Sequence, residues 1–296
     1  MPANDAIHSL LCMKERELLL ITALACEATP LIAAWDLKPL RENTLGERFQ
    51  VFHRGDTFVA ISGVGKIRAA IATSALTTEL FSRSSQPILA NIGIAGSSAT
   101  DLPLGSLVYV NKIRDCATNS RLYPDVIARH GLPELALETH DLPVTTPHTE
   151  RVLVDMEGAG FMHAALTLTA PSAVCVLKII SDYCSAARIT PQQAEDLVRM
   201  NVATITDILN TLRSELPQDL ALDDEEQELL RAATTHASLS LTQRIELTRY
   251  ARALKAHNAS CTEALQQLLA TPITTKESRN AAFKKTIAAL SRSIAL

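Results

Sequence analysis

The first two thirds of the chain alternate short apolar runs with longer amphipathic segments. The runs have strand length, and the segments carry apolar residues at helical spacing. The strand-like runs are 18–24, 88–94, 106–110, 151–156 and 173–180, and the helical segments are 26–35, 66–81 and 158–167. Residues 49–53 and 57–62 predict a hairpin, because Gly55 between them tolerates the positive φ of a tight turn. This alternation predicts an α/β fold with a mainly parallel sheet.

The pattern changes after residue 190. Residues 191–212 predict one long helix, and Pro217 then precedes an acidic run at 223–226. We place a domain boundary there, with an α/β domain at 1–216 and an all-helical extension of unknown role at 217–296. The helices predicted in the extension are 224–236, 241–256, 259–270 and 276–294. A partner protein for this helical tail is one open role.

Composition narrows the class of protein. Hydrophobic residues make up 47% and charged residues 20% of the 296 positions, which supports a packed core and excludes a disordered chain. The net charge of -4 gives no overall attraction to nucleic acid or to an anionic membrane. Residues 229–296 are basic, but only Tyr250 and Phe283 could stack on bases there. We therefore interpret that surplus as a solvated surface and expect no nucleic-acid partner.

Cysteine usage and the apolar runs bear on the compartment. Six cysteines are scattered without a Cys-x-x-Cys pair, which indicates reduced packing residues. The start of the sequence lacks the basic-then-apolar order of a secretory signal. No apolar run approaches the ~20 residues of a membrane span. We expect a cytoplasmic protein without membrane contact.

Three carboxylates follow three of the predicted buried strands. Glu27, Glu157 and Asp182 each come directly after an apolar run. Ligands of α/β sheets bind outside the carboxyl ends of the strands, so these acids are the candidates for a site. One such acid alone is more often a helix N-terminal residue that favours the dipole. The three together suit cleavage of a glycosidic bond, which needs a proton donor, a carboxylate for water and acceptors for sugar hydroxyls.

Segments that contain these acids resemble a known superfamily. They are ITALACEATPLIAAW, ISGVGKIRAAIAT, NIGIAGSSATDLPLGSLVYV, LVDMEGAGF and LKIISDYC. The set, which covers about 17–214, resembles the nucleoside phosphorylases and nucleosidases, and most of all the methylthioadenosine/adenosylhomocysteine nucleosidases. The resemblance implies a three-layer α/β/α domain with a mixed central sheet and a homodimer or larger homo-oligomer. It implies a small-molecule nucleoside substrate and no cofactor.

The resemblance also implies roles for the acids and their neighbours. Asp182 would protonate the purine at N7, held by Ser181. Glu157 would bind the ribose 2′- and 3′-hydroxyls, with Met156 packed on the sugar. Glu27 would position the attacking water. An exposed Asp, with a pKa of about 3.9, is ionised at neutral pH, so Asp182 must be buried or bonded to the base to act as an acid.

Four further residues complete the implied site. Ala95 and Gly96 would bring bare backbone to the nucleoside, and Val64 would form an apolar wall. Ile94 stands where the resembling enzymes usually carry a small hydroxyl residue near the water.

The interval between residues 115 and 155 is shorter than is usual in the resembling enzymes. In those enzymes the corresponding interval contains a strand and an aromatic residue that contacts the base. In this chain the interval shows no obvious equivalent of either. Its histidines, His130, His140 and His148, lack the spacing of ligands on one helix face, and no acid is placed to complete a set. We interpret them as loop histidines and expect no metal. The glycine spacings also lack a dinucleotide fingerprint.

Three functions stay open from the sequence. The leading hypothesis is a nucleosidase that hydrolyses a purine nucleoside, with a 5′-modified adenine nucleoside as the expected substrate. A purine nucleoside phosphorylase would need cations for phosphate, and Lys66 and Arg68 are the candidates, although they more simply fit exposed residues early in a helix. A catalytically impaired nucleoside-binding or interaction protein is the third, favoured by Ile94 and the short interval.

Overall fold

The computed structural model describes residues 16–40, 48–81, 86–146, 150–185, 189–216, 222, 224–256 and 260–294. The chain divides into two compact units, Met1–Leu216 and Pro217–Leu296. Each unit has its own hydrophobic core and is described by itself.

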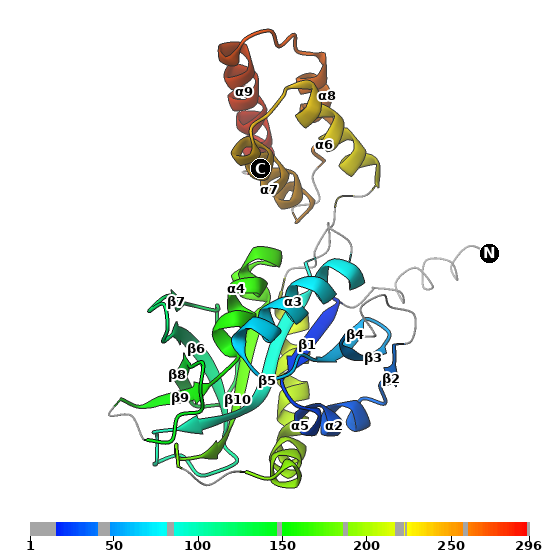
Figure 1. Cartoon of the computed structure of the whole chain (residues 1–296). Helices are drawn as coiled ribbons and strands as arrows, with labels where there is room; N and C mark the ends of the chain where they lie inside the picture. The colour runs from blue at the N-terminus through cyan, green and yellow to red at the C-terminus, as the bar shows by residue number, and fades with distance from the viewer. Residues whose placement is uncertain are drawn as a thin grey trace, which may run out of the picture. The chain divides into compact units, whose positions relative to one another are not determined.

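One mixed sheet runs through the first unit (Figure 1). Its described strands are β1 (Leu18–Thr22), β2 (Lys38–Pro39), β3 (Gln50–Arg54), β4 (Thr57–Ile61), β5 (Ile88–Ser97), β6 (Leu107–Asp115), β7 (Arg121–Leu122), β8 (Glu134–Thr139), β9 (Val152–Asp155) and β10 (Val174–Asp182). Their order is β10-β6-β8-β9-β5-β1-β4-β3-β2, with β7 on β6. Because β10 also pairs with β5, the strands β5, β10, β6, β8 and β9 close into a ring.

The strand directions confirm the mixed sheet that the resemblance implies. β1 is parallel to β4 and β5, β10 is parallel to β5, and β8 is parallel to β6 and β9. The remaining pairings, β2–β3, β3–β4, β5–β9, β6–β7 and β6–β10, are antiparallel. Most of the paired residues nevertheless lie in parallel pairs, as the alternation predicts. The predicted hairpin, β3–β4, and the short pairings β5–β9 and β6–β10 are among the antiparallel pairs that make the sheet mixed.

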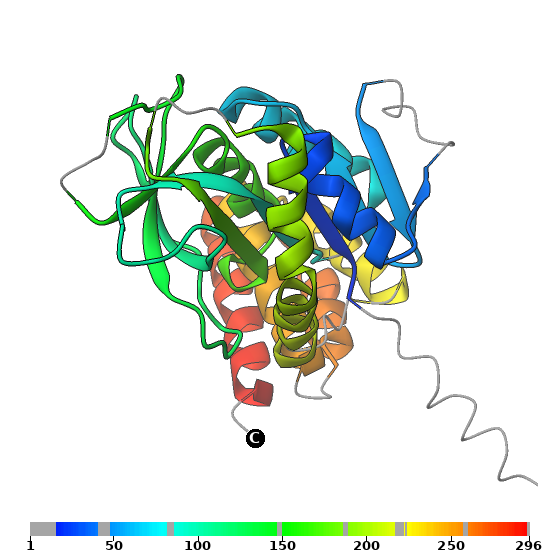
Figure 2. The same cartoon turned by 90° about the horizontal axis from the view of Figure 1, so that it is seen from below.

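Helices cover both faces of the sheet. Leu19 and Ile21 of β1 pack in the core beneath α3 (Lys66–Leu80) and α4 (Gly158–Leu168). Leu18 and Leu20 point the other way, into the core beneath α2 (Ala25–Ala34) and α5 (Pro191–Glu215). Figure 2 shows α2 and α5 in front of the strands, in blue and yellow-green. Burial on both faces explains why the strands are continuous apolar runs, and it confirms the three-layer α/β/α fold.

The helices and long strands of the first unit occur where the pattern predicts them, to within a few residues. The interval 115–155 is the exception, because β8 lies within it at Glu134–Thr139. The expectation that this interval lacks a strand is therefore wrong. The run ELALET contains two glutamates, so the sequence shows neither a continuous apolar run nor a clean alternation there. In the structure its residues are likewise not all buried. A 3₁₀ turn at Pro171–Ala173 leads into β10.

The second unit is helical in its described residues. It contains α6 (Asp224–His236), α7 (Leu241–Ala256), α8 (Thr262–Ala270) and α9 (Lys276–Ile294), which confirms the predicted helices. Leu230, Leu247, Leu265, Phe283 and Leu290 belong to its core. Among the residues that the structure describes, no helix combines the length and the apolar character needed to cross a membrane. A partner for this unit stays a prediction.

Gly160 lets α4 pass close to the start of α3. A Cβ atom on Gly160 would lie 1.8 Å from the carbonyl oxygen of Lys66, closer than any van der Waals contact. The two helices therefore pack at a distance that only glycine permits here.

We expect Gly160→Ala to lower the free energy of unfolding by about 1–3 kcal/mol or more, because the backbones must separate. Alanine is otherwise the better helix former by about 1 kcal/mol, so the sign of the change tests the contact. Gly131→Ala is the matched control, since a Cβ there meets nothing within 4 Å. Urea unfolding of both variants measures the difference, and a Gly160→Ala protein as stable as the parent would contradict the packing.

Candidate active site

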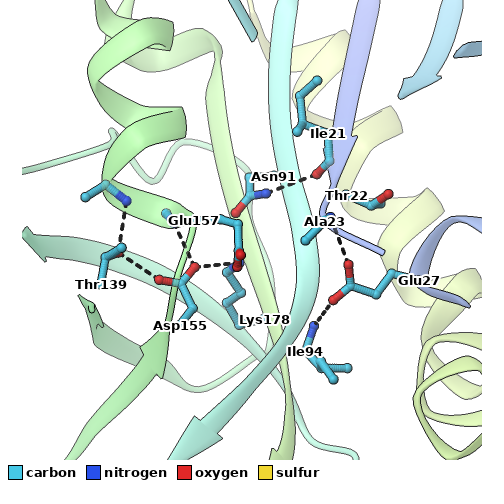
Figure 3. Close-up of polar contacts among 12 residues, drawn as sticks. Ile21, Thr22, Ala23, Glu27, Asn91, Ile94, Thr139, Asp155, Glu157 and Lys178 are labelled. Carbon is cyan, nitrogen blue, oxygen red and sulfur yellow. Dashed lines mark hydrogen bonds and ion pairs between the residues drawn. The ribbon is translucent and has the colours of Figure 1, made fainter. Parts of the chain in front are cut away.

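The Glu27 side chain links the residues just before α2 to β5 by hydrogen bonds. Its side chain is only 3% exposed in spite of its charge. Oε2 accepts hydrogen bonds from the backbone N–H groups of Ala23 and Leu24, each at 2.9 Å, and Oε1 accepts one from Ile94 at 2.9 Å (Figure 3). A carboxylate has about four acceptor positions, so these bonds fix its orientation and leave about one position for a ligand or water.

The approach of Glu27 to β5 requires a glycine. A Cβ atom on Gly93 would lie 2.7 Å from Glu27 Oε1, inside contact distance. Burial raises the pKa of Glu27 above its ordinary value, while the backbone donors and the charge of Lys178 act in the opposite direction. Glu27 is therefore a stronger base than an exposed glutamate.

Glu157 lies at the N-terminus of α4 and reaches across to the loop before α3. It is 8% exposed, and its Oε1 accepts a hydrogen bond from the backbone N–H of Gly65 at 2.7 Å. Gly65 has a φ of 105°, in the region that favours glycine. This bond fixes the direction of the carboxylate at the edge of the sheet.

Lys178 is a buried cation in the middle of β10. Its side chain is 2% exposed, and its Nζ lies 2.9 Å from Oδ2 of Asp155, which is equally buried (Figure 3). Burial by itself would lower the pKa of Lys178, but the charges of Asp155, Glu157 and Glu27 outweigh it, so the pKa is raised. Lys178 is therefore charged and lies within the field of three acids.

Asp155 is held by neutral donors as well as by the lysine. Its Oδ1 accepts the hydroxyl of Thr139 at 2.7 Å, and its Oδ2 accepts the backbone N–H of Gly158 at 2.8 Å. These bonds occupy acceptor positions on both of its oxygens. Its charge then acts on Glu157, whose pKa is raised to about 7, first by burial and next by Asp155, against the opposing effects of Lys178 and Gly65. Glu157 thus exchanges a proton close to neutral pH.

Asp182 ends β10 and lies half-buried beside Gly96. A Cβ atom on Gly96 would lie 3.3 Å from Asp182 Oδ1. The hydroxyl oxygen of Ser181 is 2.8 Å from Asp182 Oδ2 and 3.1 Å from the carbonyl oxygen of Ala95. The backbone N–H of Ser185 reaches Oδ1 at 3.4 Å. Ser181 is thus in contact with Asp182, and its role in a site stays a prediction.

Two of the three acids that follow the predicted strands, Glu27 and Asp182, lie against the same stretch of β5, residues 93–96, and Glu157 is near enough to Glu27 for the charge of Glu27 to raise its pKa. Glu27 lies beside Gly93 and bonds to residue 94, and Asp182 lies beside Gly96. β9 runs antiparallel to this stretch, with Val154 paired to Gly96, and Glu157 follows β9 two residues after its end. The remaining candidates differ in burial: Ala95 is buried, Ile94, Gly96 and Met156 are half-buried, and Val64 is 46% exposed.

Sequence reasoning missed Lys178, Asp155 and Thr139, which support the acids. Lys178 could have been recognised from the sequence, because a lysine inside the apolar run VCVLKII needs a buried acid as its partner. Asn91 also faces this region (Figure 3). Its Nδ2 donates to the carbonyl of Ile21 at 3.0 Å, and its buried Oδ1 has no hydrogen-bond partner among the described residues.

The two candidate phosphate ligands have other partners. Lys66 Nζ lies 2.9 Å from Oδ1 of Asp115 and 3.0 Å from Oδ1 of Asp141, and its side chain is 18% exposed. Arg68 donates through Nε to the carbonyl oxygen of Ser62 at 3.0 Å. The simpler expectation for Lys66, an exposed residue early in a helix, is wrong because it pairs with a buried aspartate.

The described histidines of the interval 115–155 lie outside helices and strands, as expected, and each has a specific partner. The ring of His130 stacks on Tyr109 with centroids 4.5 Å apart. His140 Nε2 lies 3.3 Å from Cys116 Sγ and 3.7 Å from Glu138 Oε2. His130 Nε2 also lies 3.8 Å from Glu134 Oε1, so the expectation that no acid is placed with these histidines is wrong for both. His148 lies outside the described residues.

Comparison with solved structures places this arrangement in a known fold. The 5′-methylthioadenosine nucleosidase of Arabidopsis thaliana, in apo form, has a TM-score of 0.56 at 18% identity, over 68% of this chain and 99% of that one. The 5′-methylthioadenosine/S-adenosylhomocysteine nucleosidase of Neisseria meningitidis, in complex with methylthio-immucillin-A, scores 0.53 at 18% identity, over 68% and 100%. This is the methylthioadenosine nucleosidase fold.

A third structure with the nucleosidase fold is a Helicobacter pylori variant with 5′-methylthioadenosine in its active site. It has a TM-score of 0.52 at 17% identity and covers 66% of this chain and 98% of that one. These likenesses leave about a third of this chain outside them. No protein-family model and no curated protein sequence matches the chain. The three-dimensional structure thus shows the nucleosidase fold. At these sequence identities the likeness concerns the fold alone.

The raised pKa of Glu157 predicts a pH dependence of stability. From an ordinary value of 4.5 its pKa rises to about 7, with Asp155, Glu27 and Lys178 as the charged groups that act on it. The folded state then binds the proton more tightly than the unfolded state. The resulting stabilisation is complete below about pH 4.5 and is lost as the pH rises through about 7.

We expect Glu157→Gln, which resembles the protonated side chain, to become more stable relative to the parent as the pH rises from about 5 to 7.5. The change in relative stability should be on the order of 1–3 kcal/mol. Thermal unfolding of both proteins across this range measures it. Glu150→Gln, at an exposed site, serves as the control. Parallel curves for the parent and Glu157→Gln would contradict the assignment.

Proposed function

We propose that the first unit hydrolyses the N-glycosidic bond of a purine nucleoside, with a 5′-modified adenine nucleoside as its substrate. The observation that carries the proposal is that Glu27 and Asp182 lie against residues 93–96 of β5, with the buried Glu157 close enough to interact electrostatically with Glu27. The fold supports it, because a solved structure of this fold holds 5′-methylthioadenosine in its active site.

Asp182 is the proposed general acid that protonates the departing purine. As the bond breaks, negative charge develops on the purine, and a carboxylic acid beside its N7 can supply the proton. The contacts of Ser181 suit this role. When Asp182 carries the proton, its O–H can donate to the hydroxyl oxygen of Ser181, which then donates to the carbonyl of Ala95. This arrangement would hold the proton in place before transfer.

Glu27 is the residue proposed to orient and activate the attacking water. Three backbone N–H groups fix its carboxylate, and the burial that raises its pKa increases its basicity. A water at its remaining acceptor position would lie against β5 next to Ile94. The side chain of Ile94 offers that water no hydrogen bond, so Glu27 alone would orient it.

Glu157 is the proposed ligand of the ribose 2′- and 3′-hydroxyls. Its bond to Gly65 aims the carboxylate, and the buried Lys178 offsets the repulsion from Asp155. Met156, half-buried beside it, would pack on the sugar. Backbone at Ala95 and Gly96 would approach the nucleoside, and Val64 would provide the apolar wall.

Hydrolysis is favoured over phosphorolysis by charge. A phosphate dianion would lie among three carboxylates, and the nearby cations Lys66 and Arg68 already have partners. A second candidate function, nucleoside binding without turnover, is favoured by the apolar Ile94 at the water position. Product formation separates the two.

We expect Asp182→Asn to lower kcat for base release by about a hundredfold or more, because a positioned general acid contributes roughly that factor. Chromatography of a purine nucleoside panel, with and without phosphate, measures the free base. Asp196→Asn, an exposed site on α5, is the control and should match the parent. Release that requires phosphate would show a phosphorylase, and a parent that binds nucleoside without releasing base would show a binding protein.

The sequence resemblance implies a homodimer or larger homo-oligomer, and we propose that the first unit pairs with a second copy through α3. Ile67 and Ile71 lie one helical turn apart on α3 and are 71% and 54% exposed, and Val64, just before the helix, is 46% exposed. A patch of large apolar side chains on one face is unusual on a monomer. The patch also borders Gly65, the residue that holds Glu157.

We expect Ile71→Glu to shift the protein from dimer to monomer in sedimentation velocity, because pairing would bury the introduced charge. Met200→Glu is the matched control, since Met200 is an equally exposed apolar residue on α5, outside the patch. A parent protein that is monomeric, or a dimer unaffected by Ile71→Glu, would contradict the interface.

A further inference from the structure

Cys116, Glu138 and His140 come together where β6 and β8 end. The two strands are parallel, with Arg114 paired to Glu138, so the residues that follow them emerge side by side. The backbone N–H of Cys116 donates to the carbonyl of Thr139 at 3.0 Å, which fixes the two loops against each other. Backbone pairing therefore sets this cluster, which shares no residue with the proposed site of nucleoside hydrolysis.

The distances within the cluster fit the edges of a coordination tetrahedron. Cys116 Sγ and Glu138 Oε2 lie 3.3 Å and 3.7 Å from His140 Nε2, and one atom of each residue lies within 4.8 Å of the other two. Zinc bonds of about 2.0–2.3 Å to nitrogen, oxygen and sulfur place such ligand atoms roughly 3.3–3.6 Å apart. The nitrogen-to-sulfur separation falls within this range, and the nitrogen-to-oxygen separation is just above it.

The same three residue types could instead form a nucleophilic triad, but the geometry does not fit one. In a triad the acid orients the histidine through the ring nitrogen opposite to the one that faces the nucleophile. Here both the thiol and the carboxylate face the same atom, His140 Nε2. A thiol and a carboxylate that both approach one imidazole nitrogen fit a set of metal ligands better than a triad.

We propose that Cys116, Glu138 and His140 bind a zinc-class divalent cation, with a fourth position open to solvent. Thiolate, imidazole and carboxylate are all ligands of zinc, and the mixed set does not suit the oxygen-preferring Mg²⁺ or Ca²⁺. Cys116 and His140 are half-buried, so an ion can enter.

Groups around the cluster support its ligands. Arg114 binds Oε1 of Glu138 at 3.1 Å and leaves Oε2 toward His140, the outer bond that ligating carboxylates typically have. The backbone N–H of His140 donates to the carbonyl of Asp155 at 2.9 Å. A bound ion would therefore connect the carboxyl ends of β6 and β8 next to Asp155, which pairs with Lys178.

The test uses the full-length protein after treatment with a chelator and buffer exchange. We expect Co²⁺ to bind at one equivalent, with a near-ultraviolet band from thiolate-to-metal charge transfer, and Zn²⁺ to displace it. Cys116→Ser should remove the band, and His140→Ala should weaken Co²⁺ binding at least tenfold. Cys26→Ser and His236→Gln, also part-exposed or exposed residues, should leave both readouts unchanged.

Circular dichroism confirms that each variant is folded before it is compared. A second readout is the melting temperature, which Zn²⁺ should raise in the parent and not in His140→Ala. Absence of the band in the parent, a band that survives Cys116→Ser, or equal loss in Cys26→Ser would each overturn the site. None of these readouts depends on nucleoside turnover, so failure here and failure of the proposed hydrolysis are distinguishable.

Discussion

The ion pair between Lys178 and Asp155 is the constraint on which the rest of the first unit depends. Both side chains are almost fully buried, and removing either partner of such a pair costs about 3–5 kcal/mol because the other charge stays behind. Hydrogen bonds from Thr139 and Gly158 hold Asp155, so β8, β9, β10 and the start of α4 all contribute to one charged centre. The positive end of this pair acts on Glu157 and Glu27, which lets two further acids lie in the same interior.

Much of the fold and part of the site could be predicted from the sequence, for physical reasons that particular residues show. Strands buried on both faces, such as β1, give continuous apolar runs, and polar residues at their ends mark the edge where ligands bind. Glu27 and Asp182 were found in this way. β8 was missed because Glu134 and Glu138 interrupt its apolar character, and their partners His130 and Arg114 are apparent only after folding. The grouping of Cys116 with His140 likewise depends on the register of two strands, which local patterns do not encode.

The backbone architecture and the side chains at the strand ends determine different properties of this protein. The likeness to nucleosidases at 16–18% identity establishes the architecture of the first unit. The chemistry depends instead on which side chains the strand ends present in this chain, and here Ile94 and Lys178 shape the environment of the acids. The helical second unit has a core of its own and so meets the main condition for folding independently of the α/β unit.

The closed ring of strands has a consequence for solubility. An open sheet of this size would present two rows of unpaired backbone groups, which invite pairing with other chains. Pairing of β10 with both β5 and β6 removes one such row. At the other end, the described sheet finishes in β2, whose two exposed residues are a lysine and a proline. A proline lacks the backbone donor and a lysine carries charge, so this edge is a poor template for intermolecular strand addition.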